Sequence, residues 1–177
     1  HEESGPCPYL TTQEACLPMR LPVRPLTPAE LGQRLRAGDR RQGILLYRPN
    51  CAACVACEAI RLDVDSFTGS RSQRRTAEKA SRVLQVEVGE PMCSDRRVEL
   101  YNLHKIGRQL VADEGGPIDA AGYQAFLVDS CTQSFELRYL LDDELVGVAL
   151  VDHGDDALSA VYTYYDPAYQ KLGIGTF

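Results

Sequence analysis

The sequence predicts an α+β fold, in which a small mixed module of residues 1–90 precedes a domain of residues 91–177 that contains an antiparallel meander. Three observations predict this order. In the second half two segments flank an Asp-Asp turn and a third follows an acidic turn that contains glycine, which is typical of strands joined as hairpins. Capping signals precede four other segments and indicate helices. The first 26 residues are rich in proline and have no sustained period, so we expect an irregular lead-in.

The N-terminal module should contain two helices and three short strands. Thr27-Pro28-Ala29-Glu30 is a capping box with proline at the first helical position, and Gly38 can end the helix that follows. Ser70 or Ser72 can cap a second helix, which should run to about Ser81. The strands are predicted at Ile44–Tyr47, Ile60–Val64 and Leu84–Val88.

The second half should contain two helices and then the meander. Ser94 is expected to cap the first helix, and Asp119 to cap one that runs to about Val128. The strands of the meander are predicted at Phe135–Leu141, Leu145–Asp152 and Ala157–Tyr165. The Asp142-Asp143 pair suits the first turn between them.

The chain ends in a Q-x-x-G-x-G run, defined by Gln170, Gly173 and Gly175. After a strand, such glycines let successive backbone N–H groups point at an oxygen-rich ligand, and a helix normally follows. Because the sequence stops before such a helix, we expect a C-terminally truncated piece of a longer protein. Helices, an antiparallel meander and a glycine loop, in this order, resemble the build of GNAT-type acyltransferases.

The composition describes a globular protein with no membrane partner. Apolar residues make up 44% of the chain and charged residues 25%, and no stretch approaches the roughly 18 apolar residues of a membrane helix. The polar start, His1 to Ser4, is not a secretory signal, so we expect a cytoplasmic protein. A net charge of −6 argues against indiscriminate binding of nucleic acid.

Seven short blocks occur in the order in which they stand in one known family. They are Gly5-Pro6-Cys7-Pro8-Tyr9-Leu10, Tyr47-Arg48-Pro49 with a cysteine triplet and Arg61, Ser70-Arg71-Ser72-Gln73-Arg74-Arg75, Phe126-Leu127-Val128-Asp129-Ser130-Cys131, Glu136-Leu137-Arg138-Tyr139, Leu158-Ser159-Ala160-Val161-Tyr162 and Tyr165-Asp166-Pro167. Through them nearly the whole chain resembles the aminoacyl-tRNA–protein transferases, above all the bacterial leucyltransferases that are related to eukaryotic arginyltransferases. The resemblance implies transfer of an aminoacyl group, leucyl in preference to arginyl, from aminoacyl-tRNA to proteins with N-terminal Asp or Glu, which marks them for degradation.

Such a reaction needs no dedicated nucleophile in the enzyme. The acceptor α-amine, with a pKa of about 7.7–8.0, is partly neutral near pH 7, so the enzyme must position it and accept its proton. Asp129 and Glu136 are candidate proton acceptors, although such carboxylates often face water. Tyr162 could relay a proton or stack on the terminal adenine, although an aromatic residue in a strand is often part of the core. The glycine loop would hold the aminoacyl end.

Cationic side chains are expected to bind the two anionic partners, which are the acidic side chain of the acceptor and the tRNA. Arg61 and Arg138, beside predicted strands, are the candidates for the acidic side chain of the acceptor, because arginine binds carboxylate bidentately. The tRNA candidates form a strip with helical spacing, at i, i+3, i+4 and i+8. This strip consists of Arg71, Arg74, Arg75 and Lys79. Solvated or structural roles are the alternatives for both groups.

The cysteine pattern does not decide whether the protein binds a metal cofactor. Cys51, Cys54 and Cys57 form a triplet, and with Cys7 they could supply four thiolates to zinc or to an iron–sulfur cluster. Buried reduced thiols are the alternative, and the reaction itself requires no cofactor.

Two other functions compete with aminoacyl transfer. A CoA-dependent N-acetyltransferase would account for the glycine loop and the meander but not for the basic strip or the cysteines. A non-catalytic thiol–metal module would account only for the cysteine triplet.

Overall fold

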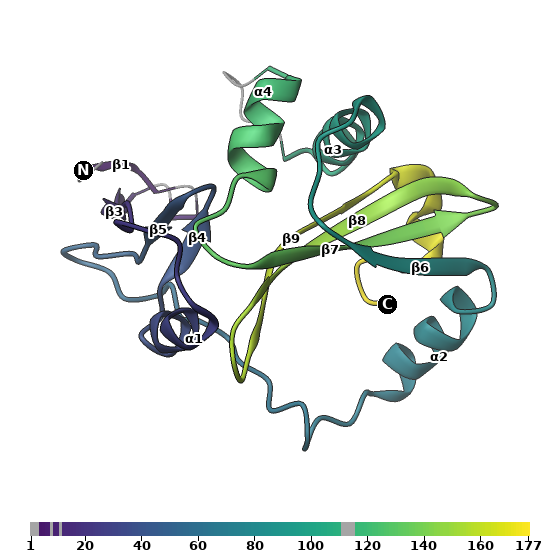
Figure 1. Cartoon of the computed structure of the whole chain (residues 1–177), viewed down its shortest axis with the longest axis horizontal. Coiled ribbons are helices and arrows are strands. Elements are labelled where there is room, and N and C mark those ends of the chain that lie inside the picture. Colours follow the sequence, from purple (N-terminus) through teal and green to yellow (C-terminus); the bar gives the residue numbers. More distant parts are fainter. Residues whose placement is uncertain (1–3, 8, 11, 111–115) are drawn as a thin grey trace.

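The computed structural model describes residues 4–7, 9–10, 12–110 and 116–177 and shows an α+β arrangement of antiparallel sheets and helices (Figure 1). Its main sheet has four strands in the order β6-β7-β8-β9, and every neighbouring pair is antiparallel. These strands are β6 (Leu84–Gly89), β7 (Ser134–Leu141), β8 (Glu144–His153) and β9 (Leu158–Tyr165).

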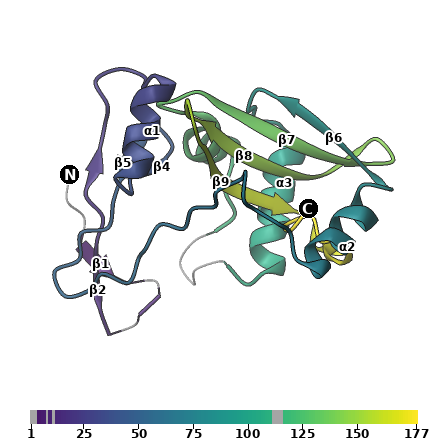
Figure 2. The same ribbon diagram turned by 90° about the horizontal axis from the view of Figure 1, so that it is seen from below.

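Helices cover both faces of this sheet (Figures 1 and 2). On one face lie α3 (Asp95–Gly107), α4 (Ala120–Tyr123) and the π-helical turn η1 (Gln124–Val128). On the other lie α2 (Arg71–Ala80) and the 3₁₀ turn η2 (Pro167–Leu172). Because both faces are covered, the central strand β8 is buried over a continuous run of seven residues, 146–152.

Two cores result from this layering. The first joins Leu100 and Tyr101 of α3 to Val148 and Leu150 of β8. The second joins the last residue of α2, Ala80, to the opposite face of the sheet. The sheet is therefore fixed from both sides, and its strand ends and outer edges are the places where a site can form.

The N-terminal residues form a separate small layer beside the main sheet (Figure 2). Its elements are β1 (Ser4–Pro6), β2 (Glu14–Cys16), β3 (Met19–Arg20), α1 (Pro28–Arg36), β4 (Arg40–Gln42) and β5 (Leu45–Tyr47). β1 pairs with β2, and β5 lies between β3 and β4. Backbone hydrogen bonds connect this layer to the rest, from the Leu26 N–H to the Cys131 carbonyl and from the Asp155 N–H to the Pro28 carbonyl.

Most predicted elements are confirmed, because their signals are local. Thr27 and Glu30 cap α1 reciprocally, Ser70 and Gln73 do the same for α2, and the hydroxyl of Ser94 accepts from the N–H of Arg97 at the start of α3. Asp142 and Asp143 form the β7–β8 turn with φ values of 50° and 65°, the left-handed conformation that aspartate tolerates.

Several predictions about elements are wrong, incomplete or shifted. The strand expected at Ile60–Val64 does not form, since residues 48–70 contain no helix or strand. The lead-in of residues 1–26, expected to be irregular, contains the short strands β1, β2 and β3. β4 was not predicted either, and β5 starts one residue later than expected. β6 pairs with β7, so a strand that the expected boundary at residue 90 places in the N-terminal module belongs to the sheet of the second half.

No helix among the described residues is long and apolar enough to cross a membrane.

Candidate functional site

A cleft of about 510 Å³ lies between the N-terminal layer and the start of β9. One wall comes from α1 and β4, a second from residues 58–61, and the third from Ala157–Val161. Four arginines line it: Arg36, Arg40, Arg41 and Arg61. The acidic residues that line it are Asp39 and Glu58, so the cleft favours an anionic ligand.

Arg61 is the one predicted site residue that lines this cleft. Its Nη2 donates to the carbonyls of Leu35 (2.9 Å) and Arg36 (2.5 Å). These carbonyls lie at the C-terminal end of α1, where a cation is stabilised, and the Leu35 carbonyl also accepts from the Gly38 N–H. The interaction fixes the Arg61 guanidinium in the wall, although the side chain comes from a segment without regular structure.

The other cleft arginines were not predicted as site residues. Arg36 forms an ion pair with Asp156 (Nη1–Oδ2, 2.7 Å), and Arg40 has a long contact with the Glu58 carbonyl (3.4 Å). The sequence signal for them is the concentration of arginine between residues 34 and 48. This stretch crosses the end of α1 and therefore shows no single helical spacing, unlike the strip in α2.

Asp39 is the counter-charge of this region. Its carboxylate is 2% exposed and lies 3.6 to 3.8 Å from the guanidinium nitrogens of Arg20, Arg34 and Arg48. Arg48 also donates to the Ala37 carbonyl at 2.6 Å. Since one carboxylate faces three guanidinium groups, an excess of positive charge remains beside the cleft.

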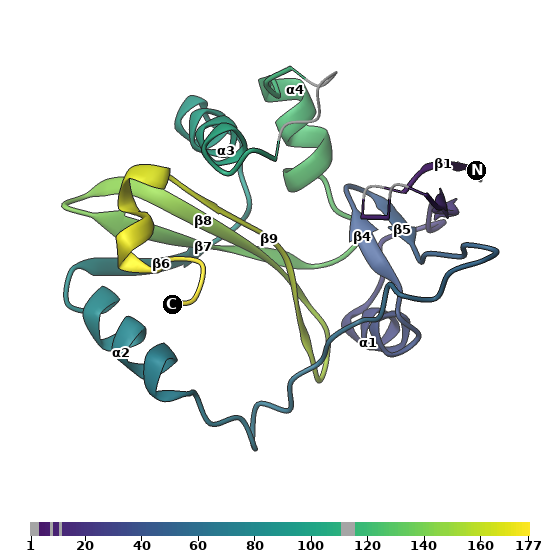
Figure 3. The same ribbon diagram turned by 180° about the vertical axis from the view of Figure 1, so that it is seen from behind.

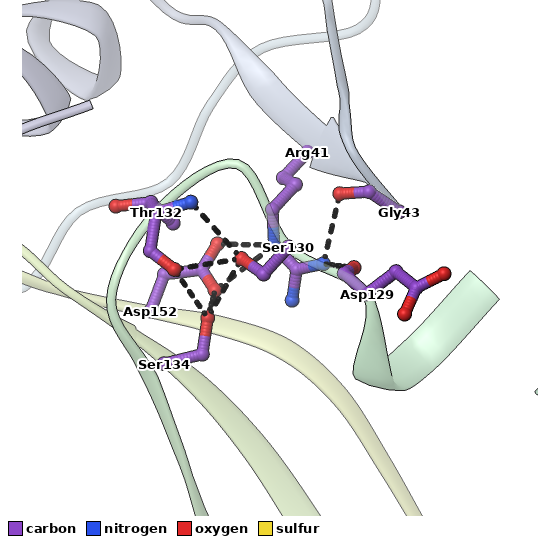
Figure 4. Close-up of polar contacts among 7 residues, drawn as sticks. All are labelled: Arg41, Gly43, Asp129, Ser130, Thr132, Ser134 and Asp152. Atoms are coloured by element: carbon purple, nitrogen blue, oxygen red, sulfur yellow. Dashed lines mark hydrogen bonds and ion pairs between the residues drawn. The ribbon is translucent and has the colours of Figure 1, made fainter. Parts of the chain in front are cut away.

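A buried ion pair fixes β4 against the main sheet (Figure 4). The side chains of Arg41 and Asp152 are 1% and 2% exposed, and Nε lies 2.9 Å from both carboxylate oxygens. Ser134 donates to Asp152 at 2.7 Å, and Nη1 of Arg41 donates to the carbonyls of Gly43 (3.1 Å) and Asp129 (3.2 Å). This pair positions the β4 wall of the cleft.

Neither predicted proton acceptor lines the cleft. Glu136 is 0% exposed and is paired with Arg97 and with Nε of Arg138 at 2.7 Å. A carboxylate enclosed in this way cannot reach a substrate amine, so the structure favours a structural role. Asp129 is exposed, accepts from Gln124 Nε2 at 2.8 Å and lines a separate shallow hollow.

Arg138 does not join Arg61 at one site. Its side chain is 26% exposed and bonds to Glu136 and, at 3.7 Å, to Glu87. Its guanidinium also lies directly over Gly89, where a Cβ would collide with Nη2. The two carboxylates occupy Arg138, so the predicted pair of acceptor-binding arginines is not brought together.

Tyr162 belongs to an aromatic cluster. Its ring lies 5.5 Å from that of Tyr101 and 6.1 Å from that of Phe126. Behind it the hydroxyls of Tyr123 and Tyr164 contact each other in the core. Burial raises the pKa of Tyr123 to about 12, so it stays neutral near pH 7. Tyr162 itself is half-buried.

The basic strip forms as predicted on one exposed face of α2. All four of its cationic side chains are exposed. Arg74 bonds to the Gly69 carbonyl, and Lys79 donates to the Lys171 carbonyl at 2.8 Å. Arg71 and Arg75 form no ion pair with any described residue.

The glycine run forms a turn against α2 (Figure 3). Gly173 has φ +73°, and a Cβ there would lie 2.5 Å from Cγ2 of Thr76. The Gly173 N–H donates to the Gln170 carbonyl, and those of Thr176 and Phe177 donate to the Gly173 carbonyl. These three N–H groups therefore close the turn instead of pointing at a ligand.

The cysteines do not gather into a metal site. Cys51 accepts from the Cys16 N–H at 3.4 Å, and Cys57 is exposed. Among the described residues, no group of three His, Cys, Asp or Glu side chains is arranged to hold a metal ion. The triplet lies in the irregular segment after β5, where no strand or helix fixes the spacing of its thiols.

An antiparallel sheet with helices on both faces and a cleft lined by four arginines define an α+β protein with a candidate site for an anionic ligand. Residues 5–75 match the family described as arginine-tRNA-protein transferase, N terminus, and residues 96–177 match its C terminus. The aspartate/glutamate leucyltransferase of Thiobacillus denitrificans is 37% identical, over 96% of this chain and 73% of its own length. Those of Chromobacterium violaceum and Marinobacter nauticus are each 36% identical, over 97% of this chain and over 70% and 71% of their own. The chain therefore belongs to the arginine-tRNA-protein transferase family, which confirms the resemblance.

Proposed function

We propose that this protein transfers an aminoacyl group, leucyl in preference to arginyl, from aminoacyl-tRNA to the α-amine of proteins that begin with Asp or Glu. The match of both halves of the chain to one transferase family carries this proposal, together with relatives named aspartate/glutamate leucyltransferase. The modified protein would enter an N-degron degradation pathway. Since charged tRNA is abundant in the cytoplasm, we place the reaction there.

The arginine-lined cleft supports selection of an acidic first residue. Only Nη2 of Arg61 is bonded to described residues, so Nε and Nη1 are available for a carboxylate. Arg40 has only its long contact with the Glu58 carbonyl. A charge-assisted bond from Arg61 would contribute roughly 1.5–3 kcal/mol, which corresponds to about a 10- to 150-fold preference.

The donor is proposed to bind on the other side of the sheet. The exposed cations of α2 suit the closely spaced phosphates of a tRNA acceptor stem. The glycine turn is next to this helix through Lys79 and Thr76. From there the 3′ end of the tRNA would extend along β9, so that the aminoacyl ester reaches the acceptor amine in the cleft. Tyr162 lies in that strand, but its ring packs against Tyr101 and Phe126 on the opposite face of the sheet, so this placement of the donor gives it no contact.

The chemistry requires positioning more than a nucleophile. The neutral α-amine attacks the ester carbonyl of the aminoacyl-tRNA, a C–N bond forms, and the C–O bond to the terminal ribose breaks. The amine loses a proton, and the ribose oxygen gains one as it leaves. The proton acceptor remains a prediction: Asp129 is the exposed candidate, whereas the burial of Glu136 argues against it.

A GNAT-like acyltransferase core is the finer fold that we propose for the main sheet. Its four antiparallel strands, with helices on both faces and a glycine turn after β9, support the proposal. The same features support the alternative of a CoA-dependent N-acetyltransferase. That alternative gives no role to the basic face of α2. It also needs the glycine turn to bind the phosphates of CoA, but three N–H groups of this turn bond to carbonyls within it.

One assay separates the two functions. Labelled leucine or arginine on tRNA is offered to peptides that begin with Asp, Glu or Ala, with and without RNase. We expect transfer of leucine to the Asp and Glu peptides and its loss when RNase is added beforehand. Acetyl transfer from CoA that survives RNase, with no aminoacyl transfer, would overturn the proposal.

A further inference from the structure

The start of β9 presents an open backbone edge. Among the described strands, β9 pairs only with β8, so at its start no strand bonds to the N–H and C=O groups of its other side. Leu158 at its start is 63% exposed. Figure 3 shows the segment after β5 passing this end of the strand.

The cleft lies along this edge and not over a face of the strand. Side chains of a strand alternate between its two faces, so a cavity over one face would be lined by every second residue. Here five consecutive residues, Ala157–Val161, line the cleft. Only the edge of a strand is shared by consecutive residues, so this lining is the pattern that a backbone edge would give.

The wall of the cleft opposite β9 is also lined by consecutive residues. Four consecutive residues, 58–61, line the cleft, and they belong to a segment that contains no helix or strand. Ile60 is 91% exposed, so this segment has not buried its apolar side chains against the protein. Two stretches of consecutive residues thus line the cleft of about 510 Å³.

We propose that the acceptor protein binds here through its first residues in extended form, as an additional strand on the open edge of β9. This inference rests on the proposed function and specifies how the acceptor is held. Main-chain hydrogen bonds to β9 would give affinity, and the arginines would select the acidic first side chain. The partner is therefore recognised by its backbone as well as by its charge.

Charge supports an acidic peptide as the occupant. Arg36 and Arg41 are compensated by Asp156 and Asp152, whereas Arg40 and Arg61 bond only to carbonyls of described residues. Two uncompensated guanidinium groups beside an open strand edge would attract a peptide with a carboxylate and disfavour one with a lysine.

A β-bulge limits how far the added strand can extend. Ala160 pairs with Val151 and Tyr162 with Leu150, so Val161 is an extra residue in β9. A bulge bends the strand and interrupts the regular spacing of its backbone groups. The acceptor should therefore pair with residues 158–160 and make no regular bonds beyond them, since the Ala157 carbonyl already accepts from the Gly154 N–H.

Backbone methylation of the acceptor tests this mode of binding. Peptides that begin with Asp are made with a single N-methyl group on residue 2, 3, 4 or 5, and their binding to the full chain is measured by calorimetry. In an added strand every second N–H bonds to β9, so we expect alternate positions to weaken binding by about tenfold or more and the positions between them by less than about twofold. Methylation that is tolerated everywhere, or equally harmful everywhere, would overturn the inference.

Two protein variants test the location. Leu158→Asp and Ile60→Asp place a carboxylate on either side of the proposed strand, and both side chains are exposed, so the fold should persist. We expect each to weaken binding of the Asp peptide by about tenfold, whereas Val55→Asp, at a 92% exposed position outside the cleft wall, should not. Unchanged binding in both variants would contradict the placement.

Failure of this inference can be told apart from failure of the proposed function. If the unmethylated Asp peptide receives leucine but methylation has no effect, only the strand addition is wrong. If the alternating pattern of binding appears but no aminoacyl group is transferred, the binding mode stands and the proposed function is wrong.

Discussion

At the scale of single residues, buried charge decides which candidates can act on a substrate. Glu136 is a reasonable candidate for a proton acceptor by sequence, because it lies in a strand within a family block. In the folded chain it has no exposed surface and is held by Arg97 and Arg138. Removal of one partner from such a group leaves an uncompensated buried charge, so its effect should appear in stability first.

Glu136→Gln should therefore lower the free energy of unfolding by about 3 kcal/mol, as measured by urea denaturation. Asp129→Asn is the matched control, because Asp129 is exposed, and it should change stability by less than about 0.5 kcal/mol. A Glu136→Gln protein of full stability that has lost all transfer activity would restore Glu136 as a catalytic candidate.

His104 makes stability depend on pH. The residue is 7% exposed and its Nδ1 accepts from the Tyr165 N–H, and burial lowers its pKa below the ordinary value. The unfolded chain, with a histidine pKa of about 6.5, then binds a proton before the folded chain does. This contribution to stability is complete above pH 6.5 and is lost as the pH falls from there through the folded pKa.

The measurement is the free energy of unfolding of the natural chain and of His104→Gln between pH 8 and pH 5. The difference between the two proteins should shrink as the pH falls, because only the natural chain must keep this ring neutral. A difference that stays constant over the range would contradict a lowered pKa at His104.

At the scale of elements, α2 is the surface that we propose for tRNA. Charge reversal of Arg74 and Arg75 should weaken tRNA binding and reduce the slope of log affinity against log salt by roughly one for each phosphate that is no longer neutralised. Arg108→Glu is the control for each single reversal, because it reverses one charge at an exposed position at the end of α3, away from this face. An unchanged salt slope in the α2 variants would remove this assignment.

Elements with local signals could be predicted from the sequence, and elements defined by distant partners could not. The caps of α1, α2 and α3 lie within three residues of the helix they begin, and the β7–β8 turn is two aspartates. Ile60–Val64 has the alternation of a strand but no neighbour to pair with, so alternation alone was insufficient. β4 has only three residues, too few to show a period.

The candidate site was less predictable for the same reason. Arg61 could be selected from the sequence, but its position follows from carbonyls 25 and 26 residues away. The Arg41–Asp152 pair joins residues that are 111 apart. The separation of Arg138 from Arg61 and the open edge of β9 are properties of the sheet order, which no short motif contains.

At the scale of the whole molecule, the sheet separates two proposed binding regions. The arginine-lined cleft lies beside the start of β9, and the basic face of α2 lies beside the turn that follows the end of β9. A single strand thus connects the region for the acceptor peptide with the region for the donor RNA. The central claim is that Arg61 in the cleft binds the acidic side chain of the acceptor's first residue and so selects acceptors that begin with Asp or Glu.

The most direct test is the ratio of kcat/KM for leucyl transfer to a peptide that begins with Asp over one that begins with Asn, in the natural chain and in Arg61→Ala. Arg108→Ala serves as the control. We predict that the ratio falls by about tenfold or more in Arg61→Ala, because the carboxylate loses its charged partner, while transfer to the Asn peptide and the control ratio stay nearly unchanged. An Arg61→Ala protein that keeps the full preference for Asp would contradict the account.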